Sequence, residues 1–362
     1  MPINPPVHDR TALLTRIPLL SLSLIIVLAM LLAMSTACRQ PTEHVFRGMT
    51  MGTVYTVRVA GVSSRAVSGL ESEIRGRLEE INASMSLYRP DSVISRFNAL
   101  ESSQSMTVGG DFWNVLRASV LVHELTDGAF DPTVKPLLDL WGFGPGSSFA
   151  IGQPPDMDQV RETLEAVGLH LIDSSEPREP RKLHPRVQLD FGGVAKGYAV
   201  DALAEVLRQR NLADFLVDIG GDVLVSGRNA GGEPWRIGLS QPDRDMVGNE
   251  VLLVLRPKNA AVLTSGDYRQ YFHHDGRYFS HVIDPRTGHP LDNGVASVTV
   301  IAESAVYADA LATGLMVMGA DAGLELVESL PDVEALFLIR VSEDQVVDRR
   351  SSGFNKVAGM EM

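Results

Sequence analysis

The chain has 362 residues, of which 44% are hydrophobic and 21% are charged, and this composition is that of a folded globular protein with a sizeable core. Its formal net charge of −13 argues against nucleic acid and anionic lipid as partners, so any recognition of phosphate must be local. A single cysteine excludes a framework of disulfides.

The N-terminus reads as a targeting segment, residues 1–37. Two arginines precede an uncharged apolar run over residues 17–37, which is typical of an export signal or a membrane anchor. Cys38 ends this run after three small residues, as in a bacterial lipoprotein whose cysteine is lipidated. Ser35 stands where the usual lipobox has an aliphatic residue, so an uncleaved transmembrane anchor stays open. Either route predicts an exported protein, tethered through a linker over residues 38–47.

The first half of the folded part mixes short strands and helices. Alternation over residues 54–59 predicts a strand with one buried face. Apolar residues recur every three or four positions between Leu70 and Ile81, which predicts an amphipathic helix. Further helices are expected over 111–125, with Asp111 as a plausible cap, and over 156–168. Large apolar residues between the prolines and glycines of residues 126–144 indicate a packed loop.

Strand patterns dominate the second half. A strand pair is expected around Gly220 and Gly221, and a helix over residues 303–319. Other strand patterns cover residues 235–239, 251–255, 261–264, 295–301 and 333–341. Because strands and helices do not alternate strictly, the predicted fold class is α+β, with a largely antiparallel mixed sheet flanked by helices. One catalytic domain is expected over residues 48–345, followed by a C-terminal tail over residues 346–362.

A glycine turn follows the short strand 187–189. Asp190, Gly192 and Gly193 lead through Lys196 into a helical pattern. Glycines let a ligand approach the backbone closely, and the free amides of a helix N-terminus attract anions, so a phosphate is the natural ligand here. Neither common phosphate fingerprint, GxxxxGK[ST] or GxGxxG, is present in this stretch. An ordinary turn with a surface lysine is the alternative.

Asp309 and Thr313 are four residues apart on a helix whose other residues are mainly Ala, Leu, Gly and Met. They therefore share one face, and the carboxylate of Asp309 is expected to be buried. A carboxylate above a hydroxyl suits a hard cation, and Mg²⁺ usually takes further ligands from water and substrate phosphate. The alternative is an aspartate that caps a neighbouring loop, with the threonine bonded to its own helix.

His281 lies beside a turn set by Pro285 and Gly288, and it could act as a base near neutral pH. A hydrogen-bonded structural histidine is the alternative. No GxSxG elbow, HExxH pair or CxxC cluster occurs, which argues against the common hydrolase, zinc-protease and thiol-redox functions.

Eight motifs in order resemble the ApbE family of FAD:protein FMN transferases, over roughly residues 45–340. They are MGTVY (51–55), SMSLYRPDS (84–92), TDGAFDPT (126–133), DFGGVAKGYAVD (190–201), DIGGDV (218–223), TSGDY (264–268), SHVIDPRTG (280–288) and ADALATG (308–314).

This resemblance implies a Mg²⁺-dependent enzyme that moves FMN from FAD onto a threonine hydroxyl of an acceptor protein and releases AMP. The acceptors of the family are subunits of membrane redox complexes. It implies a lipid-anchored protein on the periplasmic side of the cell inner membrane. The residues that would line the FAD site are Met51, Tyr88, Ala129, Phe130, Asp131, Asp190, Lys196 and Ile283. Asp309, Thr313 and the carbonyl of Gly193 would hold the metal, and His281 and Asp190 are the candidate catalytic residues.

Two other functions remain open from the sequence. An FAD pyrophosphatase would use the same residues with water in place of threonine, and would release FMN and AMP. A flavin-binding module would hold FAD without chemistry.

Overall fold

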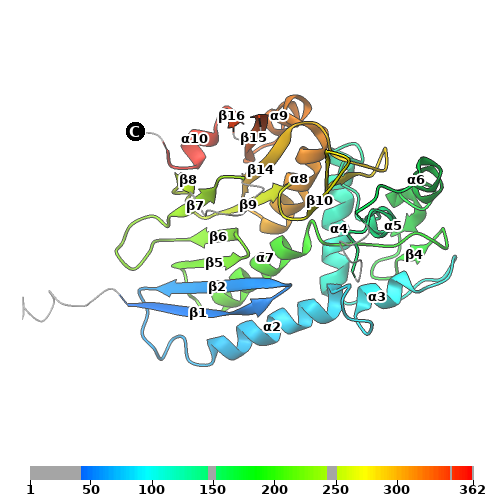
Figure 1. Cartoon of the computed structure of the whole chain (residues 1–362). Coiled ribbons are helices and arrows are strands. Elements are labelled where there is room, and N and C mark those ends of the chain that lie inside the picture. Colours follow the sequence, from blue (N-terminus) through cyan, green and yellow to red (C-terminus); the bar gives the residue numbers. More distant parts are fainter. Residues whose placement is uncertain (1–41, 146–151, 243–250, 343–344, 361–362) are drawn as a thin grey trace, which may run out of the picture. The chain divides into compact units, whose positions relative to one another are not determined.

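An eight-stranded sheet forms the centre of the fold in the computed structural model, which describes residues 42–145, 152–242, 251–342 and 345–360 (Figure 1). Every neighbouring pair of its strands is antiparallel, which confirms the expected α+β class. The strands, in spatial order, are β1 (Glu43–Thr50), β2 (Thr53–Ala60), β5 (Phe215–Ile219), β6 (Asp222–Ser226), β9 (Ala260–Gly266), β14 (Val295–Ala302), β15 (Glu334–Ser342) and β16 (Gln345–Arg350).

Two tight hairpins fix the register at one side of this sheet. Met51 and Gly52 join β1 to β2, and both have a positive φ, of 48° and 73°. Gly220 and Gly221 join β5 to β6 with φ of 63° and 92°, as the glycine pair in the sequence predicts. Turns with two left-handed residues match the twist of antiparallel strands, so these four positions fix the hairpin geometry.

Helices pack on one face of the sheet, and their apolar residues join those of the strands in the largest core cluster. The helices that contribute most are α2 (Leu70–Met85), α4 (Gly110–Leu125), α7 (Ala195–Gln209) and α8 (Ala305–Met318). A Cβ on Gly197 would lie 2.3 Å from the carbonyl oxygen of Ala305. Only a glycine therefore allows α7 to approach α8 this closely.

A second core cluster lies on the opposite face of the sheet. Leu216 and Val223 point into it from β5 and β6, whereas Val217 and Leu224 belong to the helix side. This alternation is the period-two pattern of a strand. The elements that cover part of this second face are β7 (Ile237–Ser240), β8 (Val251–Leu255) and α10 (Phe354–Val357).

Short elements beside the sheet enclose a third cluster, in which Leu137 and Trp141 are buried. Residues 126–144 are therefore packed as expected, but the stretch is not all loop, because Lys135–Leu140 form the short helix α5. The remaining elements are α3 (Val93–Asn98), α5 (Lys135–Leu140), α6 (Met157–Leu164), η2 (Leu169–Leu171), β3 (Ile172–Asp173), β4 (Arg181–Lys182), β10 (Tyr271–His274), β11 (Arg277–Ser280), β12 (Ile283–Asp284), β13 (His289–Pro290) and α9 (Ala320–Ser329).

Some boundaries differ from the expected ones. The chain enters β1 at Glu43, inside the expected linker, because eight residue pairs join β1 to β2. Residues of the expected C-terminal tail form β16, which pairs with β15, and α10. Asp111 does not cap α4, since its carboxylate accepts hydrogen bonds from Arg77 at 2.6 Å and from the Tyr198 hydroxyl at 2.6 Å.

The targeting segment and Cys38 lie outside the described residues. Among the helices of the described part, none is long and apolar enough to cross a membrane.

Candidate functional site

The glycine turn and helix α8 lie against each other. A Cβ on Gly193 would be 3.1 Å from Oγ1 of Thr313 and 3.4 Å from the ring of Phe130. One turn further along, the backbone N–H of Gly197 donates a hydrogen bond to Oδ2 of Asp309 at 2.8 Å. The two features that the sequence singles out are thus joined by direct contacts.

Asp309 and Thr313 occupy one face of α8, as their spacing predicts. The Asp309 side chain is buried, with a residue exposure of 3%. Thr313 donates a hydrogen bond to the Asp309 carbonyl at 3.3 Å, and its Oγ1 lies 3.0 Å from Oγ of Ser265, at the end of β9. The alternative to a metal site predicts an aspartate that caps a backbone amide and a threonine bonded to its own helix, and both features are present too. They leave Oδ1 of Asp309 without a hydrogen bond within the described residues.

Lys196 does not extend freely from the turn. Its Nζ forms an ion pair with the carboxylate of Asp222, the first residue of β6, which is fully buried. The other carboxylate oxygen of Asp222 accepts a hydrogen bond from the backbone N–H of Thr264 at 3.3 Å. Asp222 was not singled out from the sequence, although it lies in the DIGGDV motif, because only the strand order brings β6 next to the start of α7.

The pKa of Asp309 is raised to about 6, chiefly because burial disfavours its charged form. The positive charge of Lys196 lowers this pKa, the negative charge of Asp222 raises it, and Arg269 lowers it further. A buried carboxylate of this kind gains from a nearby cation. Asp309, Asp222, Lys196 and Arg269 are therefore one electrostatic group.

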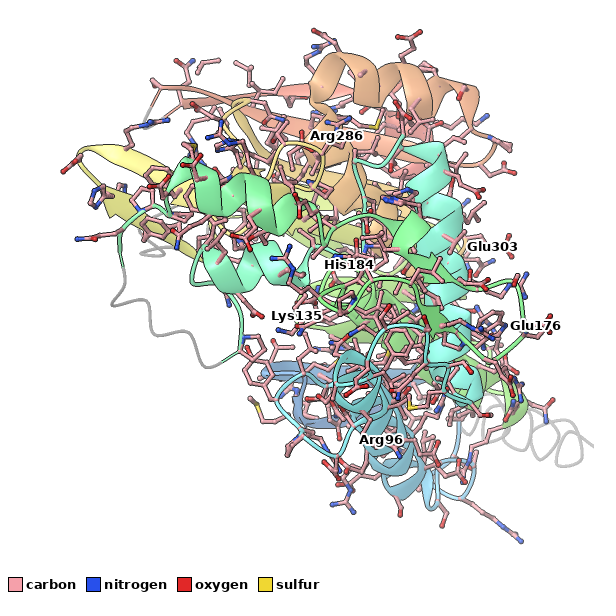
Figure 2. The ribbon with its side chains drawn as sticks, turned by 90° about the vertical axis from the view of Figure 1, so that its right-hand side faces the viewer. Arg96, Lys135, Glu176, His184, Arg286 and Glu303 are labelled. Carbon is pink, nitrogen blue, oxygen red and sulfur yellow. The ribbon has the colours of Figure 1, made fainter. Side chains whose placement is uncertain are left out.

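Asp190 precedes the turn and is half-buried. Its backbone N–H donates to the carbonyl of Pro132 at 2.7 Å, and its Oδ1 accepts from the N–H of Gly192 at 2.6 Å. Burial raises the pKa of its carboxyl, and the charge of Lys135 opposes this. Figure 2 shows Lys135 on the side of the molecule that bears α5 and α6. Asp190 thus connects the glycine turn to the loop that follows α4.

Ala129, Phe130 and Asp131 are all buried in that loop. The ring of Phe130, one of the residues expected to line the FAD site, lies against Gly193. The carboxylate of Asp131 is used inside the protein: it accepts bonds from the backbone N–H of Thr133 at 2.8 Å and of Leu169 at 3.1 Å. The side chain of Asp131 therefore shapes this loop.

His281 is held by Gln270, whose carbonyl oxygen lies 3.0 Å from the backbone nitrogen and 3.0 Å from Nδ1 of the histidine. Burial lowers the pKa of His281 to about 4, and the charges of Arg269 and Lys196 lower it further. His281 therefore lies in the same field of positive charge as Asp309. Ile283, two residues on, is buried in the third core cluster.

Met51 and Tyr88 are set apart from the other candidates. Met51 occupies the β1–β2 turn, and Tyr88 is 78% exposed in the loop after α2. In the part of the chain that the structure describes, no hydrogen bond or ring contact joins Tyr88 to the glycine turn or to α8. If both line the FAD site, they do so from the side of β1 and α2.

The oxygen atoms around Asp309 suit a hard cation. The carboxylate of Asp309, the hydroxyl of Thr313 and the carbonyl of Gly193 belong to residues that lie against one another, and no nitrogen or sulfur ligand is among them. No group of three or more His, Cys, Asp or Glu side chains that could hold a metal occurs among the described residues. A cation here would need ligands from water or substrate.

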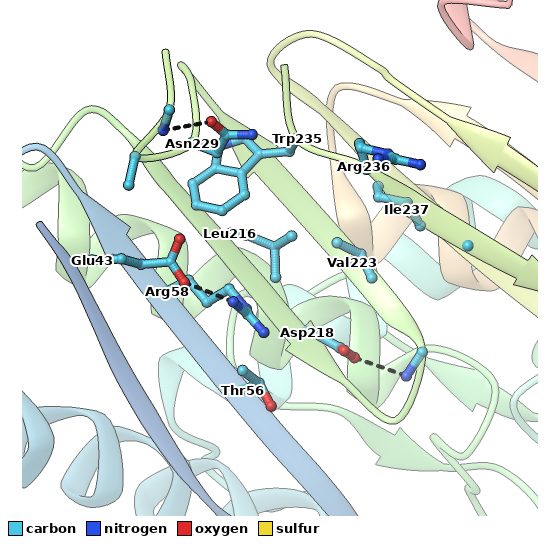
Figure 3. A pocket seen from close by; sticks show the side chains of 14 residues that line it. Glu43, Thr56, Arg58, Leu216, Asp218, Val223, Asn229, Trp235, Arg236 and Ile237 are labelled. Carbon is cyan, nitrogen blue, oxygen red and sulfur yellow. Dashed lines mark hydrogen bonds and ion pairs between the residues drawn. The ribbon is translucent and has the colours of Figure 1, made fainter. Parts of the chain in front are cut away.

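A cavity of about 650 Å³ lies on the other face of the sheet (Figure 3). Its walls include Asp218, Trp235 and the ion pair between Arg58 and Glu43, at 2.6 Å. None of the residues predicted for the site lines this cavity.

Comparisons with known proteins agree with the motifs. The model of the ApbE family matches residues 51–337. An FAD:protein FMN transferase of Vibrio cholerae is 38% identical over 336 residues, which cover 91% of this chain and 97% of the relative. One from Haemophilus influenzae is 36% identical and covers 92% of this chain and 96% of its own length.

Solved structures show the same architecture. A flavin transferase ApbE from Vibrio cholerae aligns with a TM-score of 0.77 at 35% identity, over 88% of this chain and 99% of the other. An ApbE protein from Thermotoga maritima aligns with a TM-score of 0.76 at 30% identity, over 88% and 99%.

Proposed function

The chain belongs to the ApbE family, and from this premise we propose that it is a Mg²⁺-dependent FAD:protein FMN transferase. It moves FMN from FAD onto a threonine hydroxyl of an acceptor protein and releases AMP. The observation that carries the proposal is the contact between the glycine turn and the Asp309 and Thr313 face of α8. A diphosphate at the turn would lie directly beside the oxygen ligands.

The turn and the start of α7 bind the diphosphate of FAD. Val194, the residue before the helix, makes no side-chain cap. Of the first amides of α7, that of Ala195 donates to the carbonyl of Phe191 and that of Gly197 to Asp309, which leaves the N–H of Lys196 without a partner among the described residues. A free amide at a helix N-terminus attracts an anion, and the Lys196 side chain, paired with Asp222, lies beside it. The Phe130 ring beside Gly193 supplies an apolar surface for one of the two ring systems of FAD.

Asp309, Thr313 and the Gly193 carbonyl would hold the metal, since Asp309 offers a buried carboxylate, the Thr313 hydroxyl lies one helical turn further along α8, and Gly193 packs against Thr313. Mg²⁺ held there would neutralise charge on the diphosphate. The burial of Asp309 keeps water from weakening that attraction.

His281 accepts the proton of the attacking hydroxyl. Because the carbonyl of Gln270 can only accept a hydrogen bond, Nδ1 carries the hydrogen and Nε2 is left with a lone pair. A pKa of about 4 keeps the ring neutral at physiological pH. The threonine oxygen forms a bond to the FMN phosphorus, the bond from that phosphorus to the AMP oxygen breaks, and the proton passes to Nε2.

The test uses FAD, Mg²⁺ and a redox-complex subunit produced without its flavin. The proposal expects a fluorescent acceptor band, AMP in equal amount, and an FMN-sized mass added to one threonine. Free FMN and AMP with an unmodified acceptor would instead identify an FAD pyrophosphatase. FAD binding with no AMP at any Mg²⁺ concentration would identify a flavin-binding module.

Asp309→Ala tests the metal assignment. We expect it to abolish Mg²⁺-dependent transfer while the circular dichroism spectrum is retained, because the variant loses the only carboxylate of the ligand set. Transfer at the normal rate would refute the assignment.

We also propose that the protein acts on the periplasmic side of the cell inner membrane, held by a lipid on Cys38. The apolar run that ends at this lone cysteine supports the proposal. Cys38→Ser should move the protein from the membrane to the soluble fraction. Retention in the membrane would indicate an uncleaved transmembrane anchor instead.

A further inference from the structure

Arg269 is an exposed cation in the segment that follows β9. Its Nη2 donates a hydrogen bond to the carbonyl of Thr264 at 3.3 Å. Among the described residues, no ion pair uses its guanidinium, whereas Lys196 is paired with Asp222 and Arg340 with Asp267 at 3.2 Å. Arg269 also shares a side-chain hydrogen bond with the neighbouring Tyr268, and no carboxylate of the described residues neutralises its charge.

Backbone contacts place Arg269 at the edge of the candidate site. The carbonyl of Thr264 holds the arginine, and the N–H of the same residue donates to Asp222. The next residue, Ser265, lies 3.0 Å from Thr313. On its other side, the arginine is followed by Gln270, whose carbonyl holds His281.

Charge at the site supports a role for this arginine. Lys196 is already neutralised by Asp222, and Asp309 adds a second buried carboxylate. Arg269 lowers the pKa of both Asp309 and His281, so its positive charge acts on the Asp309 and Thr313 face of α8 and on the candidate base. Because Asp222 offsets the charge of Lys196, the negative charge that develops on the phosphoryl group during transfer can draw on Arg269 as a further cation.

We propose that Arg269 is a further catalytic residue, whose guanidinium binds the FMN phosphoryl group while it passes from AMP to the acceptor threonine. This inference rests on the proposed function. Charge spreads over the equatorial oxygens of the phosphoryl group as the new oxygen–phosphorus bond forms and the bond to AMP breaks. The planar fork of an arginine matches those oxygens better than a lysine does.

The experiment compares Arg269→Ala and Arg269→Lys with the wild-type protein. The matched control is Arg277→Ala, because Arg277 is also exposed and unpaired among the described residues, but lies over the Phe279 ring in β11. Transfer is measured with FAD, Mg²⁺ and the flavin-free redox-complex subunit. The Kd for FAD is measured separately by quenching of flavin fluorescence.

We expect kcat to fall about 100-fold or more in Arg269→Ala, as when one preorganised donor to a transition-state oxyanion is removed. The KM and Kd for FAD should change by less than about threefold, since an interaction made in the transition state affects kcat alone. Added guanidinium ion should restore part of the rate in Arg269→Ala, and Arg277→Ala should behave as wild type. Arg269→Lys should be intermediate.

Three results would overturn the inference. One is a kcat for Arg269→Ala within a few-fold of wild type. Another is a loss confined to KM and Kd, which would make Arg269 a ground-state binding residue. The third is a loss of kcat that neither guanidinium ion nor Arg269→Lys restores. If the wild-type protein releases no AMP, the proposed function fails. If the wild-type protein releases AMP and one of these three results is obtained, only the inference about Arg269 fails.

Discussion

Asn98, the last residue of α3, anchors the segment that leads into the glycine turn. Its Nδ2 donates to the carbonyl of Leu189 at 2.8 Å, and its Oδ1 accepts from the N–H of Leu189 at 2.7 Å. Leu189 is fully buried and directly precedes Asp190. Asn98→Leu keeps the side-chain size but leaves both backbone groups of Leu189 without partners.

The expected cost follows from those two groups. A buried backbone donor or acceptor without a partner costs about 1–3 kcal/mol, and the leucine regains part of this through apolar burial. We expect Asn98→Leu to lower the free energy of unfolding by about 2–4 kcal/mol. The affinity for FAD should fall as well, because the position of Asp190 and the turn is no longer fixed.

Urea unfolding, followed by tryptophan fluorescence, measures this loss. The control is Ser119→Ala, whose buried hydroxyl donates to Val115 of its own helix at 2.8 Å. That carbonyl keeps its helical partner, so the control should lose less than about 1 kcal/mol. A loss in Asn98→Leu no larger than in the control would refute the reasoning.

Three further predictions concern the site. Gly197→Ala should separate α7 from α8, because its Cβ would lie 2.3 Å from the Ala305 carbonyl and 2.7 Å from Cβ of Asp309. We expect a lower melting temperature and weaker Mg²⁺ binding, both measured by calorimetry. Wild-type values for both would contradict the close packing. Lys196→Ala should raise the Kd for FAD, measured by flavin fluorescence, and an unchanged Kd would show that the lysine does not reach the phosphates. The imidazole of His281 should titrate near pH 4 in NMR spectra of the folded protein, and His281→Gln identifies its signal. Because the folded pKa lies below that of the unfolded chain, this group favours unfolding progressively as the pH falls from about 6.5 toward 4. A titration midpoint near 6.5 would refute the burial argument.

Local patterns predict much of the fold. The glycine pair at 220 and 221 marks the β5–β6 hairpin, and the expected strand over residues 251–255 coincides with β8. The apolar composition around Asp309 correctly indicates a buried helix. These features depend on neighbours in the sequence, which a pattern can report.

Contacts between distant segments are what the sequence could not supply. The ion pair between Lys196 and Asp222 depends on the order of strands in the sheet. The sequence predicts Asp111 as a helix cap, and it gives no sign of the true partner, Arg77, which lies 34 residues away. Arg269 also gave no local signal, since its importance comes from the absence of a carboxylate beside it within the described residues. The tertiary arrangement of the strands and helices decides the roles of these charged residues.

The candidate site draws on stretches scattered from residue 129 to residue 313, and its last contribution comes from helix α8 in the final sixth of the chain. A nascent polypeptide that lacks α8 has neither Asp309 nor Thr313, and its glycine turn has no surface to rest on. Binding of the nucleotide consequently requires that α8 has been synthesised and has packed against the glycine turn. A chain truncated before α8 should therefore transfer no flavin.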